Sequence, residues 1–304
     1  MAQKIKMADK SLVLYVTGGT GFVGTALSQA WLARSEKHSV VIQTRRPQDY
    51  DDTSRCRYVA DYSEVKMPVL ALVNLAGAPI ADTRWTDKRK RLLETSRIAL
   101  TESLVSTTKM APPEVVVSAS AIGYYGCNDE AVDESHGPGT GFAASLCDRW
   151  ERAAAPFAEH SRLVIPRLGV VLGPGGALDK LRPLYRLGLG GPIGGGRQWF
   201  SWIHRNDVVR VILAAIDSPS WSGAFNTVAP QAVRQKDFAT ALGRALKRPA
   251  CIPTPSLALR VVYGQMAQEL LIGGQKVVPS HLEKMGFEFS YPDIDSALAA
   301  VLEE

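Results

Sequence analysis

The sequence has little cysteine and lacks any paired motif for a metal. Four cysteines stand at positions 56, 127, 147 and 251, with no C-x-x-C pair and no Cys/His cluster. Zinc sites and disulfide frameworks need such closely spaced ligands or pairs. The sequence therefore predicts no metal site and no disulfide scaffold, and it favours a reducing compartment.

Long hydrophobic runs and secretory signals are missing as well. No apolar stretch is long enough to cross a bilayer, and the first ten residues hold no apolar core of a signal peptide. The expected location is the cytoplasm or the reducing interior of an organelle, with no secretory signal and no membrane partner.

Charge of one sign is not concentrated in a block. The net charge is +5, and Lys and Arg are spread along the chain. A mildly basic surface suits small anions such as the phosphates of a dinucleotide, whereas nucleic-acid binding calls for clustered basic residues. We expect a small-molecule substrate and no nucleic acid; an anionic substrate and a homo-oligomer are left open.

A glycine-rich turn follows the apolar run 12–16 and leads into a helical pattern over 25–32. In this strand–turn–helix setting, Gly18 would allow the tight turn, Gly21 would admit a pyrophosphate, and Gly24 would let the helix pack on the strand. The phosphates would lie on the free N–H groups of the helix. The predicted cofactor-binding residues of this turn are Thr17, Gly18, Gly19, Thr20, Gly21, Phe22, Val23 and Gly24.

Further strand-like runs alternate with helical patterns through the first half of the chain. This alternation predicts an α/β fold, a doubly wound parallel sheet of the Rossmann type with helices on both faces. After Gly173 the chain becomes rich in Gly and Pro, and from Gln235 it reads as mostly helical. We expect a dinucleotide-binding domain at 11–175 and a smaller, partly helical substrate region at 176–304, with some strand and helix returning to the core. The runs expected as strands are 39–44, 58–60, 70–76, 114–120 and 162–168, and those expected as helices are 87–109, 141–151 and 178–186.

The residues after the second strand indicate the cofactor. NAD sites usually place an acidic residue there for the ribose 2′-hydroxyl, and NADP sites place an arginine for the 2′-phosphate. Here the chain continues with Thr44, Arg45 and Arg46. The sequence therefore predicts NADP(H).

The Gly-x-x-Gly-x-x-Gly spacing after a threonine resembles the short-chain dehydrogenase/reductase superfamily, in its extended and atypical epimerase/dehydratase-like branches. The resemblance runs along nearly the whole chain and narrows to the epimerase-family, cell-division-inhibitor-like subfamily. Its further matching segments are 74–77, 95–98, 118–126, 150–151, 167–173, 190–194, 198–204 and 275–279.

The resemblance implies roles for several residues. It places Asn74, Leu75, Ala76 and Gly77 beside the adenosine ribose, and Arg97 near the cofactor. Asp61 would bind the adenine amino group or would simply be an exposed carboxylate.

For catalysis, the resemblance implies that Ser120, with Ser118 as second choice, polarises the substrate oxygen. The superfamily's Tyr-x-x-x-Lys pair is missing here, because Phe142 and Leu146 occupy the matching positions. Neither side chain transfers a proton, so Tyr124, Tyr125 or a bound water remain as proton donors.

A stretch dense in aromatic and polar groups, 197–207, follows a glycine-rich segment and is expected to be a binding loop. Arg197 would pair with an anionic substrate group, and Trp199 would stack on a ring. His204 and Asp207 are expected to be structural, and Trp202 to lie in the core.

These observations predict an NADP(H)-dependent oxidoreductase or epimerase-like enzyme that transfers hydride to or from an unidentified small molecule. The alternative is a sensor or scaffold that binds NADP(H) without catalysis. Loss of the Tyr and Lys favours the alternative, and the retained serines favour the enzyme.

Overall fold

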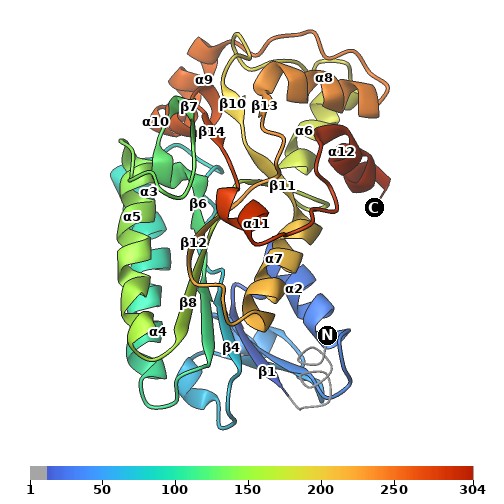
Figure 1. The fold of residues 1–304 in the computed structure, drawn as a ribbon. Coiled ribbons are helices and arrows are strands. Elements are labelled where there is room, and N and C mark those ends of the chain that lie inside the picture. The colour runs from blue at the N-terminus through green and yellow to red at the C-terminus, as the bar shows by residue number, and fades with distance from the viewer. Residues whose placement is uncertain (1–11, 304) are drawn as a thin grey trace.

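The computed structural model describes residues 12–303 and shows a parallel sheet flanked by helices (Figure 1). The strand order is β12-β8-β5-β4-β1-β2-β3, β6 also pairs with β8, and every pairing within the sheet is parallel. The strands of this sheet are β1 (Val13–Thr17), β2 (Ser39–Gln43), β3 (Cys56–Val59), β4 (Ala71–Asn74), β5 (Val115–Ser118), β6 (Ser120–Ala121), β8 (Arg162–Leu168) and β12 (Gly223–Thr227).

The two faces of the sheet are covered by different helices, as the alternation along β1 requires. Leu14 and Val16 lie in one core cluster with residues of α2 (Phe22–Leu32) and α7 (Arg205–Asp217). Tyr15 points the other way, into a cluster with residues of α4 (Leu100–Thr108) and α5 (Phe142–Ala154). Both faces are buried, and the predicted doubly wound α/β fold is confirmed.

The helical pattern expected at 87–109 is one long helix with an irregular middle. It consists of α3 (Asp87–Glu94), the π-helical turn η3 (Thr95–Ala99) and α4. A π-turn inserts an extra residue into the helix and is often found near functional sites. In this chain the π-turn carries Arg97.

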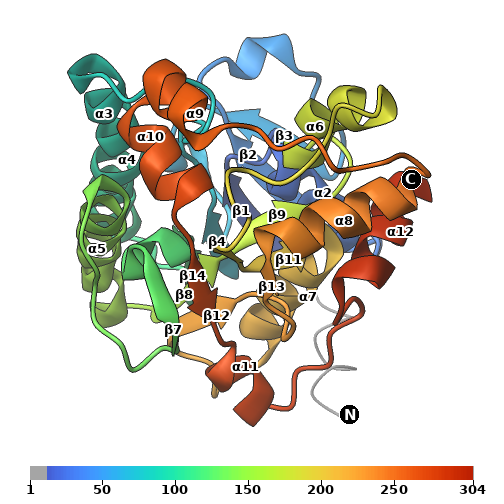
Figure 2. The same cartoon turned by 90° about the horizontal axis from the view of Figure 1, so that it is seen from above.

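A second layer of structure lies above the carboxyl edge of the sheet (Figures 1 and 2). Its core cluster joins α6 (Ala177–Arg186), α8 (Gln235–Ala245) and α12 (Ile294–Glu303). Because α7 packs on the main sheet and β12 pairs within it, the chain returns to the first layer after residue 200. The domain boundary expected at 175/176 stays a prediction.

The stretch 197–207 is not the loop that the sequence predicted. It holds β10 (Trp199–Phe200) and β11 (Trp202–His204), and α7 starts at Arg205. The strands form because their partners, β13 (Val233–Arg234) and β9 (Val170–Leu172), come from distant parts of the chain. A pattern within the segment gives no sign of such pairing.

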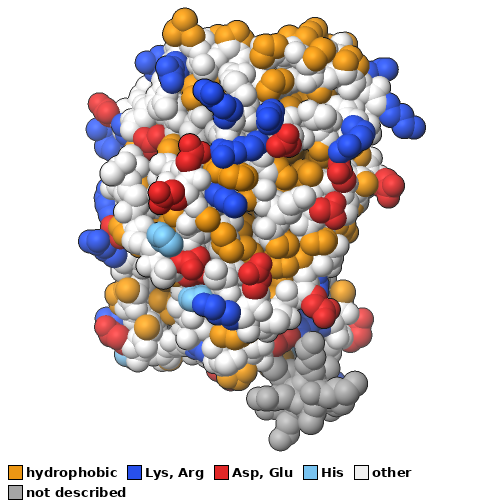
Figure 3. Space-filling model, turned by 45° about the horizontal axis from the view of Figure 1, so that its top comes forward, with side chains coloured by type: hydrophobic (Ala, Val, Ile, Leu, Met, Phe, Trp, Pro, Cys, Tyr) orange, Lys and Arg blue, Asp and Glu red, His pale blue; other side chains and the backbone are white. Residues whose placement is uncertain are grey.

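Within residues 12–303 no helix is long and apolar enough to cross a membrane. Figure 3 shows hydrophobic side chains gathered over the upper end of the molecule, with basic and acidic side chains interspersed below them.

The remaining elements are short or peripheral. They are η1 (Pro47–Asp49), η2 (Tyr62–Glu64), η4 (Ile122–Tyr125), β7 (Asn128–Val132), η5 (Ala155–Glu159), α9 (Ser256–Tyr263), α10 (Gln265–Ala267), η6 (Gln268–Ile272), β14 (Gln275–Val277) and α11 (Ser280–Lys284).

Replacing Gly24 with alanine should destabilise the fold, because a Cβ there would lie 2.2 Å from the Gly18 carbonyl oxygen. Overpacking of this kind costs about 1–3 kcal/mol. Urea unfolding followed by circular dichroism measures the change. Gly137→Ala is the matched control, since no atom lies within 4 Å of a Cβ at that position. Equal unfolding midpoints for the two variants would contradict the packing argument.

Candidate functional site

The glycine turn between β1 and α2 has the geometry of an anion site. Gly18 has a φ of +69°, and a Cβ on it would lie 2.9 Å from the Leu75 carbonyl, so only glycine fits. Gly21 is the N-cap of α2 and offers no capping side chain, and the first turn of the helix has no acidic residue. The first N–H groups of α2 are therefore open to a negatively charged ligand.

The other residues of this turn have distinct surroundings. Thr20 is exposed, and Val23 is half-buried. Gly19 packs on Ile42, where a Cβ would lie 2.8 Å from the side chain. The Phe22 ring lies against Gly173 and Gly176, and so connects the turn to the chain that follows β9.

Arg45 and Arg46 are exposed immediately after β2. The register pairs Thr17 with Gln43, so these arginines come two and three residues after the strand position next to the glycine turn. Arg46 makes a loose ion pair with Asp49 at 3.9 Å, and the Thr44 hydroxyl accepts a long hydrogen bond from the Arg46 N–H at 3.5 Å. Both side chains are thus exposed, close to the strand end beside the turn.

A buried polar network fixes the ends of β1, β4 and β5. The Thr17 hydroxyl donates to Asn74 Oδ1 at 2.6 Å, and Asn74 Nδ2 donates to Thr101 at 2.9 Å and to Ser118 at 3.5 Å. Thr17 also accepts the N–H of Ala76 at 3.2 Å. Thr17 therefore holds the Asn74–Gly77 turn in place from inside the protein, and Thr101 and Ser118 support the Asn74 side chain.

Arg97 is half-buried behind the same turn. Its guanidinium donates to the carbonyls of Ala78 and Leu93 at 3.0 and 3.3 Å, and it lies 5.3 Å from the Trp150 ring. A Cβ at Gly77 would lie 2.7 Å from this guanidinium. Gly77 is thus small because Arg97 lies against it, and burial lowers the pKa of Arg97.

Asp61 acts as a structural cap. Its side chain accepts the N–H of Ser63 at 3.0 Å, and Glu64 accepts the N–H of Asp61 at 2.9 Å. Together they form a capping box at the start of η2.

Ser120 is the start of a buried chain of hydrogen bonds and an ion pair. Its hydroxyl donates to Glu151 Oε1 at 2.6 Å, and Arg167 grips the same carboxylate with Nε at 2.9 Å and Nη2 at 2.8 Å. Although burial lowers the pKa of Arg167, the hydrogen bonds and the charge of Glu151 raise it overall. Arg167 is therefore a permanent cation inside the site.

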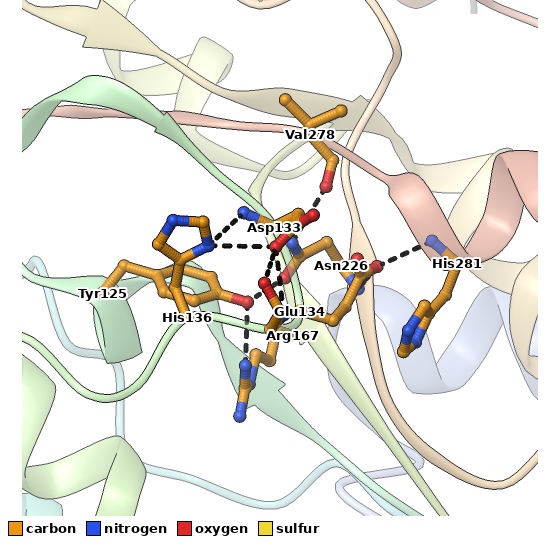
Figure 4. Close-up of polar contacts among 9 residues, drawn as sticks. Tyr125, Asp133, Glu134, His136, Arg167, Asn226, Val278 and His281 are labelled. Atoms are coloured by element: carbon orange, nitrogen blue, oxygen red, sulfur yellow. Dashed lines mark hydrogen bonds and ion pairs between the residues drawn. The ribbon is translucent and has the colours of Figure 1, made fainter.

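The two tyrosines of η4 flank Arg167 in different ways. The buried Tyr125 hydroxyl donates to Asn226 Oδ1 at 2.7 Å and accepts from Arg167 at 2.8 Å (Figure 4). Tyr124 is half-buried, and its ring lies 3.6 Å from the Arg167 guanidinium. Burial raises the pKa of both tyrosines and outweighs the lowering by Arg167.

The positions of the missing Tyr and Lys are filled by a hydrophobic cluster. Leu146 is buried in it, and the Phe142 ring packs edge-on against Trp85 at 4.9 Å. Glu269 caps this end of α5 from afar, accepting the N–H groups of Phe142 and Ala143 at 3.1 and 2.8 Å. Where the superfamily has its proton-donating Tyr and the associated Lys, this chain thus has packed apolar side chains.

Arg197 and Trp199 lie away from these residues, on the second layer. Arg197 is exposed and lines a hollow of about 370 Å³ together with Gln198, Asn128 and Gly273. The Trp199 ring already lies 3.7 Å from the Arg234 guanidinium and 4.9 Å from Lys276 Nζ. Direct stacking of a substrate on Trp199 stays a prediction.

The residues expected to be structural are buried. Trp202 donates through Nε1 to the Gln231 carbonyl at 2.9 Å, and the His204 ring accepts the N–H of Asn206 at 3.2 Å. Asp207 accepts the N–H groups of Ser290 and Tyr291 at 2.9 and 3.0 Å.

Sequence reasoning missed the roles of Glu151 and Arg167. Both lie in segments that match the subfamily, yet no local pattern links them. Their pairing depends on α5 and β8 meeting in the fold. The sequence signals were the subfamily match of both segments and, for Arg167, a charged residue within an apolar run.

The comparisons with known proteins agree with this geometry. The model of the NAD dependent epimerase/dehydratase family matches residues 14–227, and that of a domain of unknown function matches 254–301. The chloroplastic SDR39U1 homolog of Arabidopsis thaliana, an epimerase family protein, is 37% identical, and the alignment covers 97% of this chain and 88% of that protein. An epimerase family protein of Mycobacterium bovis is 40% identical, with 94% and 96% covered.

A solved structure extends the likeness to the fold. The crystal structure of human epimerase family protein SDR39U1 with NADPH superposes with a TM-score of 0.88 at 34% identity, covering 96% of this chain and all of that one. With the match over 14–227 and these relatives along nearly the whole chain, the protein belongs to the NAD-dependent epimerase/dehydratase family, the extended branch of the short-chain dehydrogenases/reductases.

Proposed function

We propose that this protein is an NADP(H)-dependent oxidoreductase or epimerase-like enzyme that acts on a small molecule by hydride transfer. The observation that carries the proposal is the buried Ser120–Glu151–Arg167 arrangement, which lies at the same edge of the sheet as the uncapped glycine turn. Parallel sheets bind ligands at this edge.

The residues present fit NADP(H). The open N–H groups of α2 would hold the pyrophosphate, and Arg45, aided by Arg46, would hold the 2′-phosphate. NADPH in the human relative supports this choice. When bound, the cofactor supplies or takes the hydride at its nicotinamide ring.

The proton route follows from the direction of one hydrogen bond. Since the Ser120 hydroxyl donates to Glu151, its oxygen is free to accept a hydrogen bond from a substrate hydroxyl. As hydride leaves the substrate carbon, the substrate proton would pass to Ser120 and the serine proton to Glu151. Arg167 holds the Glu151 carboxylate in position for this transfer.

Tyr124 is the competing proton carrier, because its side chain is only half-buried. Tyr125 is the weaker candidate, since both hydrogen-bonding directions of its hydroxyl are occupied by Asn226 and Arg167. We propose a positioning role for Tyr125, which supports Arg167 from the side away from Glu151.

The substrate would carry an anionic group. Arg197, Arg234 and Lys236 line a second hollow, of about 470 Å³, with a single carboxylate, Asp129. Asp129 is already paired with Arg234 at 3.0 Å, which leaves Arg197 and Lys236 as the cations for a ligand.

A sensor or scaffold that binds NADP(H) without turnover is the second candidate. It is favoured by the burial of Phe142 and Leu146 in a hydrophobic cluster, which removes the proton-transfer pair of the superfamily.

Arg45→Ala should remove most of a preference for NADPH over NADH. A charge-assisted hydrogen bond contributes about 1.5–3 kcal/mol, or roughly 10- to 100-fold in affinity. Calorimetric titration with both cofactors measures the preference, and Arg91→Ala, an exposed arginine on α3, is the control. Equal affinities of the unmutated protein for the two cofactors would refute the assignment.

Glu151→Gln and Ser120→Ala should each lower turnover by about 10²–10⁴-fold, the usual loss when a positioned proton carrier is removed. Tyr124→Phe should cause a loss of that size only if Tyr124 carries the proton instead. Turnover is followed by NADPH absorbance against a panel of aldehydes, ketones and nucleotide sugars. The exposed Tyr50→Phe variant is the control, and circular dichroism verifies folding.

Two outcomes would overturn parts of this mechanism. Full turnover in Glu151→Gln and Tyr124→Phe would leave water or the cofactor as the proton source. If NADPH binds but no compound of the panel oxidises it, the sensor function replaces the enzyme.

A further inference from the structure

Seven of the twelve large hydrophobic side chains exposed within residues 12–303 lie between residues 184 and 262. On α9, Leu257 and Val261 are 70% and 68% exposed, and no residue of the helix is fully buried. Leu259 and Tyr263 lie on the inner face of the helix and are half-buried. The outward face of α9 is thus apolar and unpartnered. The other exposed side chains of this group are Leu184, Leu187, Leu189, Ile252 and Val262.

These side chains lie on neighbouring segments, and we name the surface of these segments the apolar band. The loop after α6 runs beside the loop before α9, and hydrogen bonds join them, from the N–H of Gly194 to the Thr254 carbonyl at 2.8 Å and from the N–H of Ile252 to the Gly190 carbonyl at 3.2 Å. In the view from above, both loops cross in front of the sheet toward α9 (Figure 2). The band therefore runs from α6 to α9 over the top of the molecule.

Cations predominate in the segments that carry the band. Residues 180–197 and 244–268 together contain eight Lys and Arg and no Asp or Glu. Three of the cations are paired with acids from outside these ranges. Four others are exposed and make no ion pair within the described part of the chain: Arg186, Lys247, Arg248 and Arg260.

An apolar surface with a basic rim fits an anionic partner. A second copy of this chain in a two-fold contact would bring the band against itself, with its unpaired cations facing one another. The band also exposes aliphatic side chains and no Trp, Tyr or Phe, the anchors that dominate many protein interfaces. Aliphatic side chains next to Lys and Arg are what a bilayer surface with anionic headgroups accommodates.

We propose that the apolar band is a peripheral docking surface for an anionic phospholipid membrane. Leu257 and Val261 would enter the headgroup region, and Lys247, Arg248 and Arg260 would lie at the lipid phosphates. The sequence alone led us to expect no membrane partner, because it has no span; surface docking needs none. The proposal stands independently of the enzymatic function.

The test is co-sedimentation of the full chain with vesicles of phosphatidylcholine, with and without phosphatidylglycerol. The chain should pellet with the anionic vesicles only, and less so at high salt, where charges are screened. Lys247→Gln with Arg248→Gln should weaken binding by roughly 10- to 30-fold. Leu257→Ser with Val261→Ser should weaken it too, including at high salt.

The matched control is Lys109→Gln with Met110→Ser, which changes one exposed cation and one exposed apolar residue after α4. It should bind like the unmutated chain. Equal pelleting with both vesicle types, no pelleting with either (the result if the partner is an acidic protein), or no effect of Lys247→Gln with Arg248→Gln would overturn the proposal. So would light scattering that shows a dimer lost in Leu257→Ser with Val261→Ser.

Discussion

The ion pair between Arg167 and Glu151 is the interaction on which the carboxyl edge of the sheet depends. The side chains are 6% and 12% exposed, so the two charges meet away from water. Removing one partner of such a buried pair typically costs about 3–5 kcal/mol, because the other charge is left without compensation. Neighbouring side chains supply further hydrogen bonds to the buried charges: the Ser120 hydroxyl donates to Glu151, and the Tyr125 hydroxyl accepts from Arg167.

The strand register explains how the pair is assembled. Arg167 on β8 is level with Ser120 on β6 and with Asn226 on β12, so three strands bring polar groups into one row. Asn226 extends the row by accepting from Tyr125, and its N–H donates to Glu134 at 2.9 Å (Figure 4). A buried polar network of this kind is stable only when its members are satisfied. The same row would position Ser120 for chemistry.

At the glycine turn, the carboxyl edge of the sheet depends on close approach of backbone segments and not on an ion pair. Gly18 and Gly24 let the turn and α2 pack without Cβ atoms, and the Thr17–Asn74 hydrogen bond holds the next strand end beside them. The open end of α2 is then aimed at the space above the sheet. An electropositive helix end and a permanent cation, Arg167, lie at one edge, which favours negatively charged ligands there.

The sheet, the glycine turn and the family could be predicted from the sequence. Near-continuous apolar runs such as 162–168 can only be buried strands in this setting, and β8 has those bounds. The conformation of Gly18 and the close packing at Gly24 each require glycine, so the spacing of the glycines predicted the turn. The missing Tyr and Lys were readable too, at Phe142 and Leu146.

Contacts between residues far apart in the sequence could not be predicted and follow from the fold. Glu269 caps α5, although more than a hundred residues separate them in the sequence. The strands β10 and β11 pair with strands from other parts of the chain. Arg167 on β8 contacts Glu151 because α5 lies beside β8. Each contact depends on where the fold brings two segments together, and no periodicity within either segment encodes that. For the same reason the fold decides the surroundings of Arg97, which the sequence left open: its half-buried side chain, on the π-turn η3, lies against Gly77.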